Sequence, residues 1–429
     1  MAVTKTGYGY NDMLNEYLTY DLLIDEFKSS DSWILKNATW DKSWRNETIP
    51  IPVQVGIANS VRMGALTAES DVAAAQYVRG NLTTQKEAWG TLKFFERDLF
   101  EHGKVSERNF LKLLPDQLTQ LIDYFKQTIS NQVLGGNVLD LPATAWDSAT
   151  DVVVVQHPER FYLNQKITLA DADTTISGYV KAINKNTGAI SVVTTRGGVT
   201  ALDLANLTEA STKIYTDGAN TEYFTSLKSM LLPAALGGSD TWAGLTKTDY
   251  PYTQPVLYDA TASTTSDWGS VTAVNASTVL KMIFHARMKG YQRNAKPKVA
   301  LCSLFHLHAV MAYLEGATTP YKQFGPAMVY ADYTEIEIGG IGGNIKLVGI
   351  REFEDTWMAL IDPQYLDLKT GPMPFKILES PDGLKYYTIR HETNGYCYLT
   401  DLVLRGDFIY RNPASATVIH SIPTYAFNG

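Results

Sequence analysis

The stretch that decides the fold runs from Ser106 to Gly136 and reads SERNFLKLLPDQLTQLIDYFKQTISNQVLGG. Its apolar residues recur mostly at steps of three or four and therefore line one side of a helix: Leu111, Leu114, Leu118, Leu121, Ile122, Phe125, Ile129 and Val133. Ser106 is a suitable N-cap, and Gly135–Gly136 supplies a stop. At about 1.5 Å per residue the helix would span roughly 45 Å, with Pro115 either kinking it or opening its second part. Taken alone, the stretch is also typical of an ordinary core helix.

The length and composition of the chain limit the number of domains and the kinds of partner that we expect. A chain of 429 residues predicts roughly two to four domains. Only 19% of the residues are charged and 25 are tyrosines, which fits either a surface largely covered by partners or a Tyr-rich β protein. The net charge is −8 and no run of Lys and Arg exceeds two, so tight charge-driven binding to nucleic acid is not expected. An acidic shell around nucleic acid remains compatible with these numbers.

The cysteines and the apolar runs bear on location. Cys302 and Cys397 lie in apolar surroundings without a CxxC pattern, which predicts free, buried thiols in a reducing compartment. The polar start from Met1 to Gly9 does not resemble a signal peptide, and no run of about 18 apolar residues predicts a membrane span.

The N-terminal region predicts an arm. Residues 11–27 read as an amphipathic helix with five acids and no basic residue, and Trp33, Trp40 and Trp44 follow it. Three tryptophans so close together indicate a segment docked either on another subunit or on its own domain.

The sequence of residues 48–99 predicts a long, extended two-stranded β-ribbon. Thr48–Val55 (TIPIPVQV) alternates apolar residues with two prolines, as an edge strand does. Residues 56–90 are too poor in large apolar residues to form a core, and Trp89–Leu99 is again extended. Because an isolated ribbon is marginal in water, we expect it to lie on a neighbouring molecule.

Short strands and turns without helices follow over residues 146–216, which predicts a small β-barrel or sandwich. The sequence NKNTG (Asn184–Gly188) is a hairpin loop, and Val180, Ile183, Ile190 and Val192 are the expected core.

Strands and helices then interleave over 220–362, which indicates an α/β layer. Helices are expected at Asn275–Lys289 and Ser303–Leu314, and strands at 298–302, 334–338, 344–350 and 357–361. Long strands are expected at 384–391, 395–410 and 416–422, and the second of these is long enough to lie beneath the helix of the opening stretch.

The motif search yields no catalytic, cofactor-binding or metal-ligating residue. The sequence GGIGG (339–343) joins two strands, whereas a phosphate loop opens a helix. His306 and His308 are two apart on a helix, so they point in different directions, and we expect one to be buried and the other exposed. The alternating pairs Asp171/Asp173 and Glu335/Glu337 fit solvated strand faces better than a weak metal site.

The order of these pieces resembles the major capsid protein of tailed bacteriophages, with the Hong Kong ninety-seven type fold. Val274–Met311 resembles the axial helix–strand–helix block of that family, and Tyr410–Ile422 (YRNPASATVIHSI) resembles its usual ending. The resemblance implies an α+β fold divided as follows: N-terminal arm 1–47, extended β-hairpin loop 48–99, spine helix and part of the peripheral domain 100–145, inserted β-barrel 146–216, axial domain 217–381, peripheral strands 382–415, and a C-terminal strand 416–429 that returns to the axial domain.

The resemblance also implies a function. The chain would self-assemble as hexamers and pentamers into an icosahedral head shell that encloses phage double-stranded DNA without specific contacts. It would meet scaffolding, portal and decoration proteins, have no cofactor, catalyse no reaction and contact no membrane. It would assemble in the bacterial host cytoplasm and reside in the virion capsid. Two alternatives stay open: a carbohydrate-active enzyme with a β accessory module, and the shell subunit of a protein nanocompartment.

Overall fold

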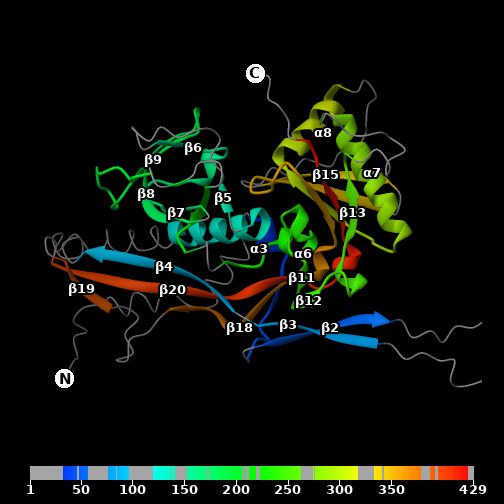
Figure 1. Cartoon of the computed structure of the whole chain (residues 1–429), viewed down its shortest axis with the longest axis horizontal. Helices are drawn as coiled ribbons and strands as arrows, with labels where there is room; N and C mark the ends of the chain where they lie inside the picture. The colour runs from blue at the N-terminus through cyan, green and yellow to red at the C-terminus, as the bar shows by residue number, and fades with distance from the viewer. Residues whose placement is uncertain are drawn as a thin grey trace, which may run out of the picture.

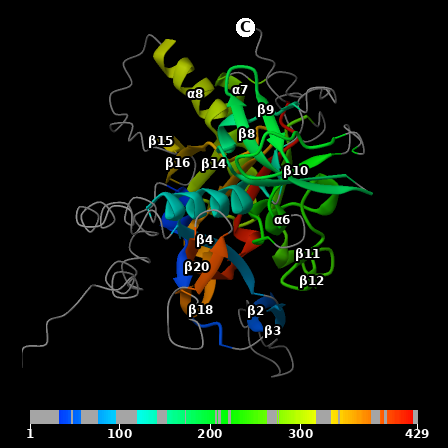
Figure 2. The same ribbon diagram turned by 90° about the vertical axis from the view of Figure 1, so that its left-hand side faces the viewer.

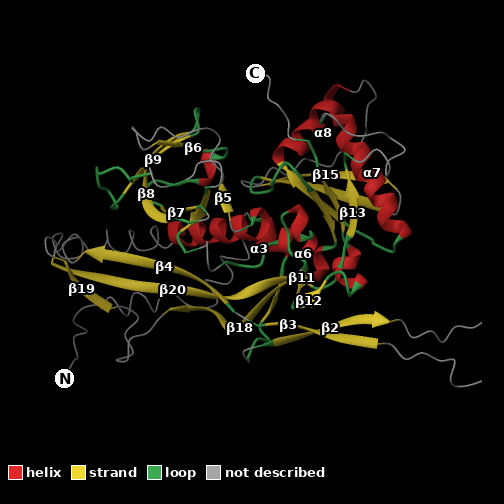
Figure 3. Cartoon of the chain, viewed as in Figure 1, coloured by secondary structure: helices red, strands yellow, loops and turns green. Residues whose placement is uncertain are grey.

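The structure is a computed structural model that describes residues 32–45, 48–56, 76–83, 85–95, 119–136, 138–140, 152–171, 173–204, 207, 212–218, 223–261, 274, 276–316, 333–340, 343–377, 387–391 and 395–423. It is a mixed α+β chain. A long helix lies across a sheet, with one lobe above each end of the helix and a two-stranded ribbon leaving at the lower right (Figure 1). Figure 3 separates its helices from its strands.

The central helix covers residues 119–130 and continues through the π-helical turn η2 (Asn131–Gly135). One side of it is buried, at Ile122, Phe125, Ile129 and Val133. Gly136 follows with φ 88°, so the glycine stop expected from the sequence is confirmed. The first part of the predicted helix, 106–118, lies outside the described residues.

The main sheet lies under the central helix. Its order is β1 (Thr39–Asp41), β18 (Leu366–Ile377), β20 (Gly395–Tyr410) and β19 (Tyr387–His391), and β4 (Lys86–Phe95) also pairs with β20. The 16-residue strand β20 is the long strand predicted for 395–410. It takes β18 and β19 in succession on one edge and β4 on the other. Figure 2 shows the same layering from the side.

The ribbon consists of β2 (Ile49–Gly56) and β3 (Gln76–Leu82), paired antiparallel. Ile49, Ile51 and Val53 are buried and Pro50 and Pro52 are exposed, so the predicted alternation is confirmed. The extent of the ribbon needs a correction.

Residues 86–95, which the sequence grouped with the ribbon, form β4 of the main sheet. Its inward-facing Ala88 and Leu92 pack against the core under the helix, and the small Gly90 between them lets the helix approach. The loop tip, with Val61, Met63, Leu66 and Val72, lies outside the described residues.

The described part of the arm packs on its own chain. Helix α3 (Trp33–Asn37) and strand β1 place Trp33 and Trp44 in the main core. The Trp44 backbone N–H donates to the Thr370 carbonyl at 3.0 Å. Of the two alternatives, docking on its own domain therefore holds for these residues, and the helix expected at 11–27 lies outside the described part.

The lobe above the left end of the helix is one antiparallel sheet with its own core (Figure 1). The strand order is β5 (Val138–Asp140), β10 (Lys213–Thr216), β7 (Lys166–Ala170), β8 (Thr175–Asn184), β9 (Ala189–Val193) and β6 (Val152–Val154). Val180, Ile190 and Val192 are buried and Ile183 is partly buried, as predicted, and Gly188 has φ 71° in the expected hairpin. The pairings among the described residues form an open path, not a closed barrel, and β5 lies before the predicted start at 146.

The other lobe contains the predicted α/β layer. Its mixed sheet runs β13 (Val256–Asp259), β21 (Thr417–His420), β17 (Met358–Ile361), β14 (Val299–Ser303), β16 (Gly343–Ile350) and β15 (Tyr333–Gly340). Helices α7 (Ala276–Gln292) and α8 (Leu304–Gly316) pack on one face of this axial sheet. Alternate residues on the other face, such as Leu301 and Val348, join the main core with the central helix and α3. The axial sheet therefore stands between α3 and α7.

Candidate functional site: the ribbon and the junction at its base

The motifs considered from the sequence do not form a reaction centre. His306 is buried beside Ser303, whose Oγ lies 3.0 Å from its Nδ1, while His308 is exposed, as expected. Burial lowers the pKa of His306 to about 4, so its ring is neutral near pH 7. Cys302 and Cys397 are free and buried, which confirms the prediction, and burial raises the pKa of the Cys302 thiol.

The acidic pairs have structural partners. Asp171 Oδ1 accepts from the backbone N–H groups of Asp173 and Thr174 in a turn. Glu335 pairs with Lys346 at 3.4 Å, and Glu337 accepts from Asn344 at 2.8 Å. Within the described ranges, no group of three or more His, Cys, Asp or Glu is placed to hold a metal ion. In the same part of the chain, no helix is long and apolar enough to cross a membrane.

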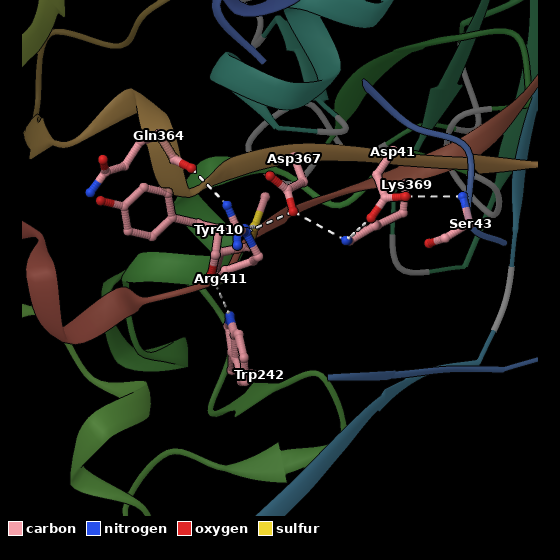
Figure 4. A network of polar contacts seen from close by, with 9 residues as sticks. Asp41, Ser43, Trp242, Gln364, Asp367, Lys369, Tyr410 and Arg411 are labelled. Carbon is pink, nitrogen blue, oxygen red and sulfur yellow. Dashed lines mark hydrogen bonds and ion pairs between the residues drawn. The ribbon is translucent and has the colours of Figure 1, made fainter. Parts of the chain in front are cut away.

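A charge network joins the arm to the C-terminal part of the main sheet (Figure 4). Asp367 is 4% exposed, and its Oδ2 lies 3.1 Å from Lys369 Nζ and 2.7 Å from Arg411 Nε. Lys369 Nζ also pairs with Asp41 on β1. Burial alone would raise the pKa of Asp41, but hydrogen bonds from Lys369 and Ser43 and the charge of Lys369 hold it below its usual value.

This charge network was not predicted from the sequence. The signal was present in β18, where Leu366-Asp-Leu368-Lys alternates buried apolar and charged residues within one strand. Such alternation predicts that Asp367 and Lys369 share a face. Pairing with Asp41, more than 300 positions away in the chain, could come only from the fold.

A second junction lies at the base of the ribbon. It is made by α6 (Leu227–Leu231), the hairpin β11 (Thr241–Trp242)–β12 (Leu245–Thr246), and β20. The Asn81 N–H of β3 donates to the Ala243 carbonyl at 2.7 Å, and a Cβ at Gly80 would lie 3.1 Å from Ala243 Cβ. Trp242 Nε1 donates to the Tyr410 carbonyl at 3.1 Å (Figure 4). The hairpin thus fixes the ribbon base to the C-terminal end of β20.

Buried polar groups hold this junction together. Lys247 Nζ donates to the carbonyls of Ser229 and Leu232 at 2.9 and 2.8 Å, which caps the end of α6, and burial lowers its pKa to about 8. Asp407 accepts from the Thr225 N–H at 2.8 Å and from its hydroxyl at 2.7 Å. Burial raises the pKa of Asp407 to about 6, although these hydrogen bonds oppose the rise.

Unlike this buried junction, the ribbon and β4 expose large side chains to solvent. On the ribbon, Pro50 and Pro52 lie opposite Asn81 and Arg79, and Tyr77 on the same strand is 65% exposed. On the outer side of β4, Trp89 is 54% exposed. Exposed Tyr, Trp and Arg are the residues most enriched at the centres of protein interfaces.

Comparisons with known proteins were made by sequence and by structure. No family model matches the chain, and no curated protein matches it. Among similar solved structures are a Cyanophage A-1(L) capsid asymmetric unit (10% identity, TM-score 0.44, 99% of this chain and 96% of that one) and the capsid of a native GTA particle (10%, 0.45, 99% and 95%). Another is a satellite phage P4 procapsid (8%, 0.38, 99% and 96%).

All three structures are described as capsids or procapsids. Identities near 10% and TM-scores below 0.5 carry no further weight. The function is therefore inferred from the chain's own elements.

Proposed function

We propose that this chain is the major subunit of an icosahedral phage head shell of the Hong Kong ninety-seven type. Its central helix would be the spine helix, the lobe around the axial sheet of β13 to β17 and β21 the axial domain, and the sheet of β5 to β10 an inserted domain. Hexamers and pentamers of the chain would enclose double-stranded DNA in the virion, after assembly in the bacterial host cytoplasm. Scaffolding, portal and decoration proteins would be its further partners, and no catalysis is proposed.

The observation that carries this proposal is the two-sided character of the ribbon. Its inner face, at Ile49, Ile51 and Val53, is buried against the base junction. Its outer face presents two prolines, Tyr77 and Arg79 to solvent. Because Pro50 and Pro52 lack an N–H, they weaken strand addition along β2. A partner would therefore cover the ribbon by its face, as expected for a loop that lies on a neighbouring subunit.

The charge network supports a subunit in which the arm, the main sheet and the C-terminal segment form one rigid body. The arm strand β1, the strand β18 and the segment at Arg411 are joined by paired charges in which Asp367 and Lys369 are 4% and 11% exposed. Removing one partner of such a buried pair costs roughly 3–5 kcal/mol. The network therefore ties distant parts of the chain into one body from which the ribbon can extend.

Assembly of the full chain tests the proposal. We expect velocity sedimentation of the purified chain to show large closed particles, with DNA or no cargo inside. The double variant Tyr77→Ser/Arg79→Ser should abolish these particles and leave the circular dichroism spectrum unchanged. Lys181→Ser, an exposed change on β8 of the inserted sheet, is the matched control and should assemble normally.

Particles that form equally well with the ribbon variant would contradict the role given to the ribbon. A chain that stays monomeric at all concentrations would contradict the shell itself. Particles that contain a defined protein cargo would favour the nanocompartment alternative.

A further inference from the structure

Helix α7 places a charged side chain at a core position. Arg287 follows Ile283 by four residues and therefore lies on the side of α7 that packs on the axial sheet. Ile283 and Ala286 are fully buried there, and Arg287 itself is 1% exposed. Arginine is almost never fully buried unless it is paired. Because its guanidinium keeps its positive charge inside proteins, Arg287 calls for a counter-charge.

The hydrogen bonds of Arg287 leave most of its donors unused. Its Nη2 donates to the carbonyl of Gly343, the first residue of β16, at 2.9 Å. Within the described ranges, its buried Nε and Nη1 have no hydrogen-bond acceptor, and no carboxylate forms an ion pair with it. A guanidinium carries five N–H donors. One neutral carbonyl therefore satisfies only a small part of this group and none of its charge.

The acidic residues of the axial lobe that the structure describes lie elsewhere. Glu335 and Glu337 alternate along β15 with the isoleucines that face α7, so both glutamates point to the opposite face of the sheet. They have other partners there. Asp259 lies on β13, at the far edge of the sheet from β16. Asp355 comes after the end of β16, whereas Gly343 begins that strand. These carboxylates therefore leave the guanidinium charge uncompensated.

A buried charge without a counter-charge is strongly unfavourable, because the ion loses its hydration and gains no compensating attraction. The buried donors of Arg287 add to this effect, since each unsatisfied buried polar group also destabilises the folded state. The planar guanidinium donates in pairs to the oxygens of carboxylate and phosphate groups. A bound oxyanion would therefore neutralise the charge and satisfy the unused donors at the same time.

Glycine backbone separates the guanidinium from solvent. The GGIGG sequence joins β15, which ends at Gly340, to β16, which begins at Gly343. Gly343 is exposed, has φ 101°, and a Cβ built on it would meet no atom within 4 Å. Its carbonyl nevertheless contacts Arg287. The guanidinium thus lies directly beneath the end of the hairpin, where the absence of side chains lets a ligand approach the backbone closely.

We propose that Arg287 binds a small oxyanion of the phosphate type beneath the Gly343 end of the β15–β16 hairpin. The depth of the guanidinium favours a small ion over a larger partner. A DNA backbone or a side chain of another subunit reaches a guanidinium at the surface, whereas a small ion enters during a brief local opening of the hairpin. The inference goes beyond the proposed function, because the site lies within one lobe and can be occupied in a single unassembled subunit.

Hydrogen exchange of α7 amides in the full chain tests the site, with inorganic phosphate raised at constant ionic strength by replacing chloride. A ligand that binds only the folded lobe slows exchange through its opening by about hundredfold when its concentration is about one hundred times Kd. Arg287→Met removes the charge and keeps an unbranched side chain in the core, so it should abolish the phosphate response. Arg293→Met, an exposed change just after α7, is the matched control and should keep the response.

Each outcome decides the proposal. A phosphate response that is lost in Arg287→Met and kept in Arg293→Met would support it. Equal responses in the two variants would mean an adventitious ion only, and absence of a response in the unsubstituted chain would also overturn the site. Should Arg287→Met fail to fold, Arg287→Lys retains the charge without the paired donors, and phosphate must bind it more weakly by ³¹P line broadening; unchanged affinity would overturn the role of Arg287. Failure of shell assembly would leave this site intact.

Discussion

At Gly90 the main sheet packs tightly against the central helix. It lies on β4 opposite Leu402 of β20. A Cβ built at Gly90 would lie 2.0 Å from Phe125 Cε2, 2.8 Å from Phe125 Cζ and 3.0 Å from Leu121 Cδ1. Phe125 is buried, so its ring cannot turn out to solvent. Gly90→Ala therefore forces the helix, the ring or the strand to move.

The change in stability caused by Gly90→Ala is the sum of two opposing effects. Gly→Ala at a compatible backbone position stabilises by about 0.4–1 kcal/mol through the unfolded chain. Forcing an extra methyl group into a packed core costs about 1–3 kcal/mol, occasionally more. With a contact as short as 2.0 Å, the second effect wins, and we expect a net loss of roughly 1–3 kcal/mol.

Native-state hydrogen exchange of the β20 amides at Leu402 and Leu404 is the suitable assay, because it reports the opening of this sheet and not of the whole multi-lobed chain. Gly339→Ala is the matched control, since that strand glycine is exposed and its nearest neighbour, Asn344 Oδ1, is 3.6 Å away. Gly339→Ala should not destabilise the chain, and at most should stabilise it by about 1 kcal/mol.

A double variant checks the cause. Phe125→Leu removes the atoms that clash, so Gly90→Ala/Phe125→Leu should lose less stability than the two single changes together. A coupling of about 0.5–3 kcal/mol is typical of residues in contact. A neutral Gly90→Ala, or strict additivity with Phe125→Leu, would refute the close packing of helix on sheet.

Three further predictions concern buried titratable groups. Asp407→Asn should stabilise the chain at pH 7 but not at pH 4. Burial raises the carboxyl pKa of Asp407 from 3.8 to about 6. The free energy of unfolding of the unsubstituted chain therefore falls as pH rises through this window, by up to roughly 3 kcal/mol at about 1.4 kcal/mol per pKa unit. A constant effect from pH 4 to 7 would contradict it. His306 should give the opposite pH dependence of stability, because its pKa is lowered from 6.5 to about 4. Amide exchange in α8 should therefore speed up as pH falls through this range. His306→Gln should remove this pH dependence. Lys369→Met should cost roughly 3 kcal/mol in a urea titration. Asp41→Asn should cost clearly less, because Asp41 is 33% exposed. Equal losses of stability in the two variants would contradict this expected difference.

Much of the fold could be predicted because its strongest signals are local. The alternation in Ile49-Pro-Ile51-Pro-Val53, the turn at Gly188 and the long strand-like stretch of 395–410 each indicate an element without tertiary help. The helix–strand–helix block at α7, β14 and α8 was likewise predicted within a few residues.

What could not be predicted depends on pairing between distant segments. Residues 86–95 look extended whether they pair with the ribbon or with β20, and the pairing with β20 depends on contacts such as the fit of Gly90 under Phe125 and the burial of Leu92. Trp44 is typical of an interface residue in the sequence, but its backbone partner, Thr370 on β18, lies more than 300 positions later. Likewise, the structural role of Asp41 depends on its ion pair with Lys369, which the local sequence does not show.

The most direct test of the central claim is a cryo-electron microscopy reconstruction of particles formed by the full chain. We expect an icosahedral shell in which density for β2 and β3 leaves one subunit at the β11–β12 hairpin and crosses a face of the next. We also expect the outer ribbon face at Tyr77 and Arg79 to be covered there. A small soluble oligomer, or a shell in which that face remains open to solvent, would contradict this expectation.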